Sequence, residues 1–268
     1  MLSVGVLTMP ASDRLGPEFR SYLTYDNYTW LKRAGLKVVP IPIGITDEEA
    51  LAYFNQIQGL YLPGGPSSEP TYMRLAFRFL DLAAAASKDR PFPIWGTCHG
   101  FQMMLLWAGA ALDPVDSMRL QKETTLRILP TKGRLFQHHR PEVDHIHFSH
   151  SLGITLAHFR QNRRLNSLFR ILATSHDRAG IEYVSVMEGI HIPFYGVQFH
   201  PEMSKSLDWM AEFFKKEMGP PLKSTALPHT FSLTKRNLRP CAAAWSEYHV
   251  DGKAPLCFVF CGKPVAKL

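Results

Sequence analysis

A tight strand-to-helix turn is encoded by Pro93-Ile94-Trp95-Gly96-Thr97-Cys98-His99-Gly100-Phe101-Gln102. The apolar run before Gly96 suits a buried strand, and the composition after Cys98 is helical. Such a turn strains the backbone of its central residue and needs small neighbours, here Gly96 and Gly100. The thiol lies at a helix N-terminus, where peptide dipoles and free N–H groups favour the thiolate. We therefore predict Cys98 as a nucleophile; the alternative is a small apolar core residue.

A second strand ends on a histidine 102 residues later, in Tyr195-Gly196-Val197-Gln198-Phe199-His200-Pro201-Glu202. Pro201 stops the strand, and the spacing of His200 and Glu202 lets a carboxylate fix the tautomer and orientation of the imidazole. Taken separately, His-Pro is ordinary turn chemistry and Glu202 suits the start of a helix. Together with Cys98, the two residues predict a catalytic set of Cys98, His200 and Glu202.

A third motif, Leu62-Pro63-Gly64-Gly65-Pro66, follows the strand-like Gly59-Leu60-Tyr61. Pro-Gly-Gly alone is a turn signal. Two glycines also let backbone N–H groups approach a ligand closely, as an oxyanion hole requires. Since ligand groups gather beyond the carboxyl ends of strands in open α/β sheets, we expect Gly64 and Gly65 to lie beside Cys98.

Strand-like and helical patterns alternate along the first half of the chain. Strands are expected at 3–9, 36–43, 58–62 and 92–97, and helices at 22–34, from Thr46, at 71–87 and after Cys98. Beyond Ala110 the pattern is irregular until strands at 181–187 and 194–199 and a closing helix at 204–218. The alternation predicts an α/β fold with a mostly parallel central sheet and helices on both faces.

The three motifs, in this order, resemble the class I glutamine amidotransferase-like fold and, within it, the γ-glutamyl hydrolases. The resemblance runs from about Val4 to about Phe214. Finer matches to the hydrolase branch are Ala34-Gly35-Leu36-Lys37-Val38-Val39-Pro40, Trp95-Gly96-Thr97-Cys98 and Ser185-Val186-Met187-Glu188-Gly189. The resemblance implies a cysteine peptidase that cleaves γ-glutamyl amide bonds, as in folylpoly-γ-glutamates. Cys98 would form a thioester, with His200 as acid and base.

The resemblance also implies a set of substrate-binding residues: Gly64, Gly65, His99, Gln102, His150 and Tyr22. Of these, His150 matches a histidine that lines the substrate site of the family, and Tyr22 is a pocket candidate. Tyr22, Tyr25 and Tyr28 at helical spacing are otherwise packing residues.

Two positions depart from the family pattern. Gln102 stands where many eukaryotic γ-glutamyl hydrolases have an acidic residue, so a γ-glutamyl-amine hydrolase or a free-standing glutaminase is the alternative function. His99 replaces an aliphatic residue; we expect its side chain in solvent and its N–H in the oxyanion hole. A non-catalytic binding protein on the same fold is disfavoured by the presence of Cys98, His200 and Glu202.

Composition fits one hydrolase domain at 1–218 and a basic, proline-containing tail at 219–268 that is partly ordered at most. The chain has 268 residues, of which 46% are hydrophobic, enough for a full core. Of the net charge of +7, residues 219–268 contribute +5. The run at 235–239 is too short and Pro-flanked to predict nucleic-acid binding, and no apolar run is long enough for a membrane span. The expected partner is a small γ-glutamyl substrate.

We expect no cofactor, and the cysteines and histidines outside the motifs have other interpretations. The four cysteines are too few for a disulfide scaffold, although a bridge between Cys257 and Cys261 is open. Histidines at 138, 139, 145, 147 and 150 could supply metal ligands. We favour the interpretation that His150 lines the glutamyl pocket and that no metal is bound.

The sequence leaves compartment and oligomeric state open, a homodimer included. The chain begins almost directly at the first expected strand, so no secretory signal is visible. The resembling eukaryotic enzymes usually enter the lysosome, the vacuole or the extracellular space. This chain is then either a cytosolic relative or a sequence whose leader is missing.

Overall fold

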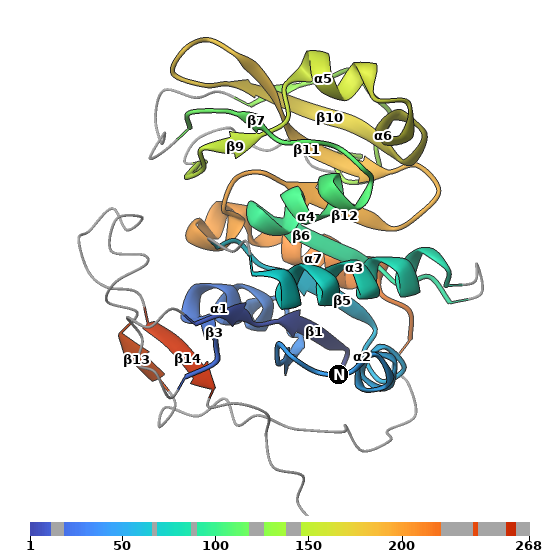
Figure 1. Cartoon of the computed structure of the whole chain (residues 1–268), viewed down its shortest axis with the longest axis vertical. Helices are drawn as coiled ribbons and strands as arrows, with labels where there is room; N and C mark the ends of the chain where they lie inside the picture. The colour runs from blue at the N-terminus through green and yellow to red at the C-terminus, as the bar shows by residue number, and fades with distance from the viewer. Residues whose placement is uncertain are drawn as a thin grey trace, which may run out of the picture.

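An eight-stranded mixed sheet organises the molecule (Figure 1), in the order β4-β1-β5-β6-β12-β11-β10-β8. The computed structural model describes residues 1–11, 19–65, 69–86, 90–117, 126–137, 146–220, 238–240 and 256–260. The parallel strands are β4 (Lys37–Ile41), β1 (Ser3–Leu7), β5 (Gly59–Leu62), β6 (Ile94–Thr97) and β12 (Phe194–Val197). The antiparallel strands are β11 (Glu182–Gly189), β10 (Phe169–His176) and β8 (Arg127–Ile128). The predicted mostly parallel sheet is confirmed.

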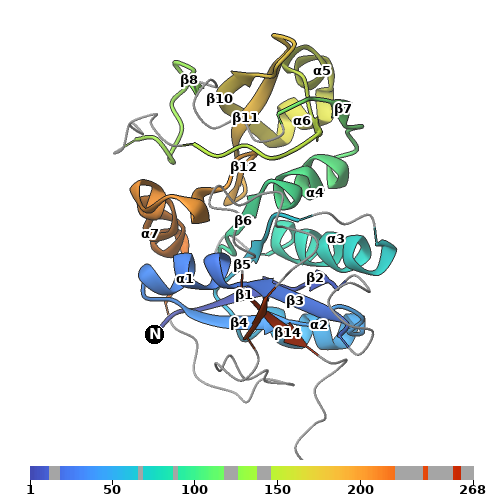
Figure 2. The same ribbon diagram turned by 90° about the vertical axis from the view of Figure 1, so that its left-hand side faces the viewer.

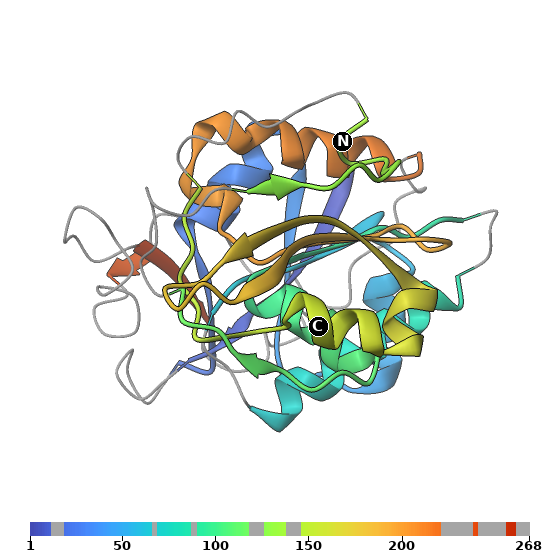
Figure 3. The same cartoon turned by 90° about the horizontal axis from the view of Figure 1, so that it is seen from above.

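Helices cover both faces of the sheet, as predicted (Figures 2 and 3). One face carries α1 (Tyr25–Arg33) and α7 (Asp208–Glu217). The other carries α2 (Asp47–Phe54), α3 (Pro70–Ala84), α4 (His99–Trp107), α5 (Leu156–Gln161) and α6 (Arg163–Leu168). Strand side chains alternate between two cores: Leu60 and Ile94 pack with the second set of helices, whereas Tyr61 and Trp95 pack with the first.

Helix ends follow the local signals in the sequence. Thr46 and Glu49 form the predicted capping box of α2, in which each side chain accepts a hydrogen bond from the backbone N–H of the other residue. Gly35 adopts a φ of +76° directly after α1, a conformation that glycine takes without steric cost. The closing helix is shorter than expected: two 3-10 turns, η2 (Pro201–Met203) and η3 (Lys205–Leu207), precede α7.

The expected helix at 22–34 is wrong at its start. Residues Ser21–Thr24 form strand β3, which pairs with β2 (Met9–Pro10) and β14 (Leu256–Phe260). With β13 (Leu238–Pro240), these strands form a second, four-stranded sheet. The physical reason is pairing with β14, which satisfies the backbone of β3 from near the other end of the chain.

One part of the segment 219–268 is thereby attached to the domain. The Phe258 ring packs against Tyr28 and Tyr25, with centroids 4.9 and 6.1 Å apart. Cys257 is buried and disulfide-bonded. Cys241 and Cys261 lie outside the described residues.

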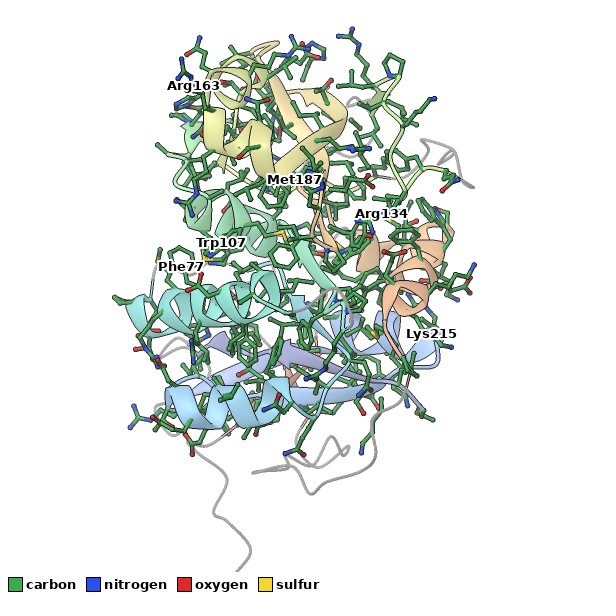
Figure 4. The ribbon with its side chains drawn as sticks, turned by 90° about the vertical axis from the view of Figure 1, so that its right-hand side faces the viewer. Phe77, Trp107, Arg134, Arg163, Met187 and Lys215 are labelled. Atoms are coloured by element: carbon green, nitrogen blue, oxygen red, sulfur yellow. The ribbon has the colours of Figure 1, made fainter. Side chains whose placement is uncertain are left out.

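The segment at 126–137 is held against the edge of the sheet by Glu188, a fully buried residue of β11. Its carboxylate accepts the backbone N–H groups of Arg134 and Leu135 at 3.0 and 3.1 Å. Arg134, which is labelled in Figure 4, also pairs with Glu217 of α7 at 3.2 Å. Its guanidinium lies over the Tyr195 ring. A two-stranded sheet of β7 (Asp113–Pro114) and β9 (Leu152–Gly153) completes the irregular region. In the described part of the chain, no helix has the length and apolar character of a membrane span.

Candidate active site

Cys98 lies at the predicted strand-to-helix turn, between β6 and α4. Its φ of +48° and ψ of −100° make it the only described non-glycine residue with positive φ. The Cys98 N–H donates to the Val197 carbonyl at 2.8 Å, which ties the turn to β12. A Cβ on Gly100 would lie 2.0 Å from the Leu62 carbonyl oxygen, so only glycine allows this close approach.

His200 follows β12, the parallel neighbour of β6, so Cys98 and His200 emerge from adjacent strands. The ring nitrogen Nδ1 lies 2.8 Å from Glu202 Oε1, and both side chains are buried. The imidazole also makes a side-chain hydrogen bond with Cys98. The structure thus brings together the three residues that the sequence predicts as a catalytic set, in the order thiol, imidazole and carboxylate.

Electrostatics at this triad favour a charged imidazole. Burial alone lowers the pKa of His200, but the negative charges of Glu202 and Cys98, with their hydrogen bonds, raise that pKa to about 10. At neutral pH the ring is an imidazolium that can hydrogen-bond a thiolate. Since the ring Nδ1–H donates to Glu202, the other ring nitrogen is left to serve Cys98.

The glycine loop after β5 lies against this pair. A Cβ on Gly64 would lie 2.6 Å from His200 Cε1 and 3.2 Å from Cys98 Cβ. Gly65 adopts a φ of +152°. His99 is the first residue of α4, so its N–H has no intrahelical acceptor. The N–H groups of Gly65 and His99 are therefore candidates for binding an oxyanion.

The expected position of the His99 side chain is wrong. The imidazole is buried rather than in solvent, with its ring 5.6 Å from that of Tyr72 in α3, because the first turn of α4 packs against α3. Burial lowers the pKa of His99 to about 4, so the ring is neutral at pH 7. Gln102 donates from Nε2 to the Leu152 carbonyl at 2.7 Å and so braces β9.

His150 shares the same acceptor. Its Nδ1 lies 3.0 Å from the Leu152 carbonyl oxygen, so Nδ1 carries the proton and Nε2 is an acceptor. Among the described residues, this buried Nε2 has no partner. Burial lowers the pKa of His150 to about 3. Tyr22 is buried in β3, within the core that also contains Tyr72.

Most of the chain matches one known protein family. Residues 21–217 match the model of the family Glutamine amidotransferase class-I.

The chain belongs to the class-I glutamine amidotransferase family.

Curated relatives carry one common name. This family member is 29% identical to human gamma-glutamyl hydrolase, over 80% of this chain and 76% of the human protein. It is 29% identical to the protein of that name from Bos taurus, over 73% and 70% of the two chains. A solved structure, that of a putative GMP synthase protein from Thermoplasma acidophilum, shares the fold. Its TM-score is 0.56 at 20% identity, over 81% of this chain and 92% of that one.

One residue that contacts the Cys98 thiol is not among those predicted from the sequence. Gln198 Nε2 lies 3.7 Å from Cys98 Sγ, and the Gln198 side chain is fully buried. The signal was present, because residues two apart in an extended segment face the same side. Gln198 precedes His200 by two positions.

The histidine-rich stretch is described only in part, since 138, 139 and 145 lie outside the described residues. His147 is buried, with its ring centroid 5.9 Å from that of His200, and its carbonyl accepts the His200 N–H at 2.9 Å. Within the described ranges, no three His, Cys, Asp or Glu residues are grouped as metal ligands.

A substitution at Gly64 tests how tightly this site is packed. We expect Gly64→Ala to lower kcat/KM by about 100-fold, because the new Cβ displaces His200 or Cys98 and small misplacements of reacting groups are costly. Steady-state kinetics measures the loss. Gly219→Ala is the matched control, since a Cβ there meets no atom within 4 Å. Equal activity of the two variants would contradict the close packing.

Proposed function

We propose that this chain is a cysteine hydrolase that cleaves γ-glutamyl amide bonds, with folylpoly-γ-glutamates as its substrates. The observation that carries the proposal is the buried His200 imidazole, hydrogen-bonded to Cys98 on one side and to Glu202 on the other. The substrate class is supported by the relatives, which are named gamma-glutamyl hydrolase in organisms from Homo sapiens to Arabidopsis thaliana.

The first half of the reaction forms a thioester. The Cys98 thiolate attacks the γ-carbonyl carbon, and the carbonyl electron pair moves to oxygen. The N–H groups of Gly65 and His99 donate to this oxyanion; each such donor contributes roughly 100- to 1,000-fold to the rate. When the carbon–nitrogen bond breaks, the His200 imidazolium gives its proton to the departing amine.

The second half restores the thiol. His200, now neutral, takes a proton from water as the water oxygen attacks the thioester carbon. The carbon–sulfur bond breaks, which releases the γ-carboxylic acid of the glutamyl product and leaves the Cys98 thiolate beside a protonated His200. The released acid then gives its proton to solvent and becomes the carboxylate. Glu202 holds the ring in one orientation and compensates its charge through both halves.

His150 is the proposed contact for a substrate N–H group. The ring is neutral and its buried Nε2 can only accept a hydrogen bond, so the group it recognises is a donor such as an ammonium or an amide N–H. Tyr22 remains a predicted pocket residue. Gln102 acts indirectly, through the Leu152 carbonyl that also fixes the His150 tautomer.

The substrate class is tested by direct competition. The same chemistry would serve γ-glutamyl amines and free glutamine, so the protein is incubated with a defined folate pentaglutamate, a γ-glutamyl amine and glutamine. We expect turnover of the pentaglutamate, with shortened folates and free glutamate or glutamyl peptides as products. Turnover of glutamine alone would contradict the proposal. Cys98→Ala is the control for contaminating hydrolases.

A further inference from the structure

Gln198 is positioned by the central sheet. It follows β12 directly, and its backbone N–H donates to the Ser185 carbonyl of β11 at 2.9 Å. Its side chain is 0% exposed, and Nε2 reaches to 3.7 Å from Cys98 Sγ. The sheet therefore holds the amide against the reacting sulfur.

The sulfur has competing neighbours. The Ser149 carbonyl oxygen lies 3.9 Å from Cys98 Sγ. That oxygen can only accept a hydrogen bond, so it favours the protonated thiol over the thiolate. A buried thiolate has also lost water and needs protein donors in its place. Two described side chains can donate to it, His200 and Gln198.

We propose that Gln198 is a further catalytic residue, whose side-chain N–H donates to the Cys98 thiolate and holds it for attack. The charge of the thiolate sets the orientation of the amide, because the oxygen end would be repelled. Consistent with this orientation, Gln198 Oε1 is buried without a partner among the described residues. His200 moves its proton during the reaction, whereas Gln198 does not titrate and remains a donor throughout.

The test measures thiolate formation without any substrate. Wild-type protein and Gln198→Met, which keeps a long unbranched side chain, are alkylated with iodoacetamide from pH 4 to pH 10. The rate is followed by mass spectrometry on the peptide that contains Cys98. We expect the pH of half-maximal alkylation to rise by about one unit and the rate at that pH to fall in the variant. An unchanged profile in folded Gln198→Met would overturn the proposal.

Two further measurements keep the test decisive. Ser175→Ala is the matched control, a buried polar truncation in β10, and we expect it to leave the profile unchanged. If Gln198→Met fails to fold, the side-chain N–H resonances of Gln198 in wild-type protein are followed by NMR. They are expected to move as Cys98 ionises and to stay fixed if the amide makes no bond to the sulfur.

This inference rests on the proposed role of Cys98 as a nucleophile, but the two can fail separately. If Gln198→Met raises the pH of half-maximal alkylation as expected but the wild-type protein hydrolyses no γ-glutamyl compound, the proposed function is wrong and the role of Gln198 toward the thiolate stands. If the wild-type protein hydrolyses a γ-glutamyl compound but the alkylation profile of Gln198→Met is unchanged, the proposed function stands and the role of Gln198 is wrong.

Discussion

Replacing Cys98 with alanine is expected to lower kcat/KM for a γ-glutamyl substrate by about 10,000-fold or more. The sulfur forms the thioester, and an alanine methyl group offers no nucleophile in its place. Residual activity would come from the oxyanion donors and substrate binding alone. Steady-state hydrolysis of a defined polyglutamate measures the loss.

Stability provides the control for this variant. Alanine keeps the Cβ at the strained φ of +48°, the hydrogen bonds of the thiol to Ser149 and Gln198 are long, and His200 keeps its bond to Glu202, so the free energy of unfolding should change by less than about 1 kcal/mol. Denaturant titration checks this. A Cys98→Ala protein that folds normally and retains more than a tenth of wild-type kcat/KM would refute the nucleophile assignment.

Glu202→Gln is expected to lower kcat/KM by about 100- to 10,000-fold and to change its pH dependence. In the wild-type protein, the Glu202 charge helps to raise the pKa of His200 to about 10. Without it, burial lowers the pKa of the ring with less opposition, and less imidazolium remains at neutral pH. The alkaline limb of kcat/KM should therefore lie near pH 10 in the wild type and at lower pH in the variant.

The same shift predicts how stability depends on pH. Because the folded-state pKa of His200 is raised above 6.5, its contribution to stability is complete below pH 6.5 and is lost as the pH rises through about 10. In Glu202→Gln, the decrease in stability at alkaline pH should be smaller. Asp208→Asn, which breaks a partly exposed pair with Arg33, is the control and should leave the pH profile of activity unchanged. If the pH profiles of kcat/KM and of stability were the same in Glu202→Gln and wild type, Glu202 and His200 would not be coupled.

The sequence predicts most of the elements that build the site, because each is marked locally. Glycines flank Cys98, proline follows His200, and both motifs end strands that read as apolar runs. Parallel pairing of β6 and β12 then brings Cys98 and His200 to one edge of the sheet, which accounts for their meeting across 102 residues.

Features set by distant partners could not be predicted in this way. Tyr22 has helical spacing with Tyr25 and Tyr28, yet it lies in a strand because β14 pairs with it from near the other end of the chain. His99 is buried because α3 places Tyr72 beside it. Gln198 lies on the same side of an extended segment as His200, but an amide that does not titrate gives no chemical sign in the sequence of a contact with a thiol.

The central claim is that Cys98 carries the glutamyl group, and a rapid acid quench tests it most directly. Protein mixed with a folate polyglutamate is quenched within one turnover and digested, and the peptide that contains Cys98 is weighed. We predict a mass increase of one γ-glutamyl acyl group on Cys98, absent in Cys98→Ala and lost on further incubation. Unmodified Cys98 throughout the first turnover, with product forming at the normal rate, would contradict the account.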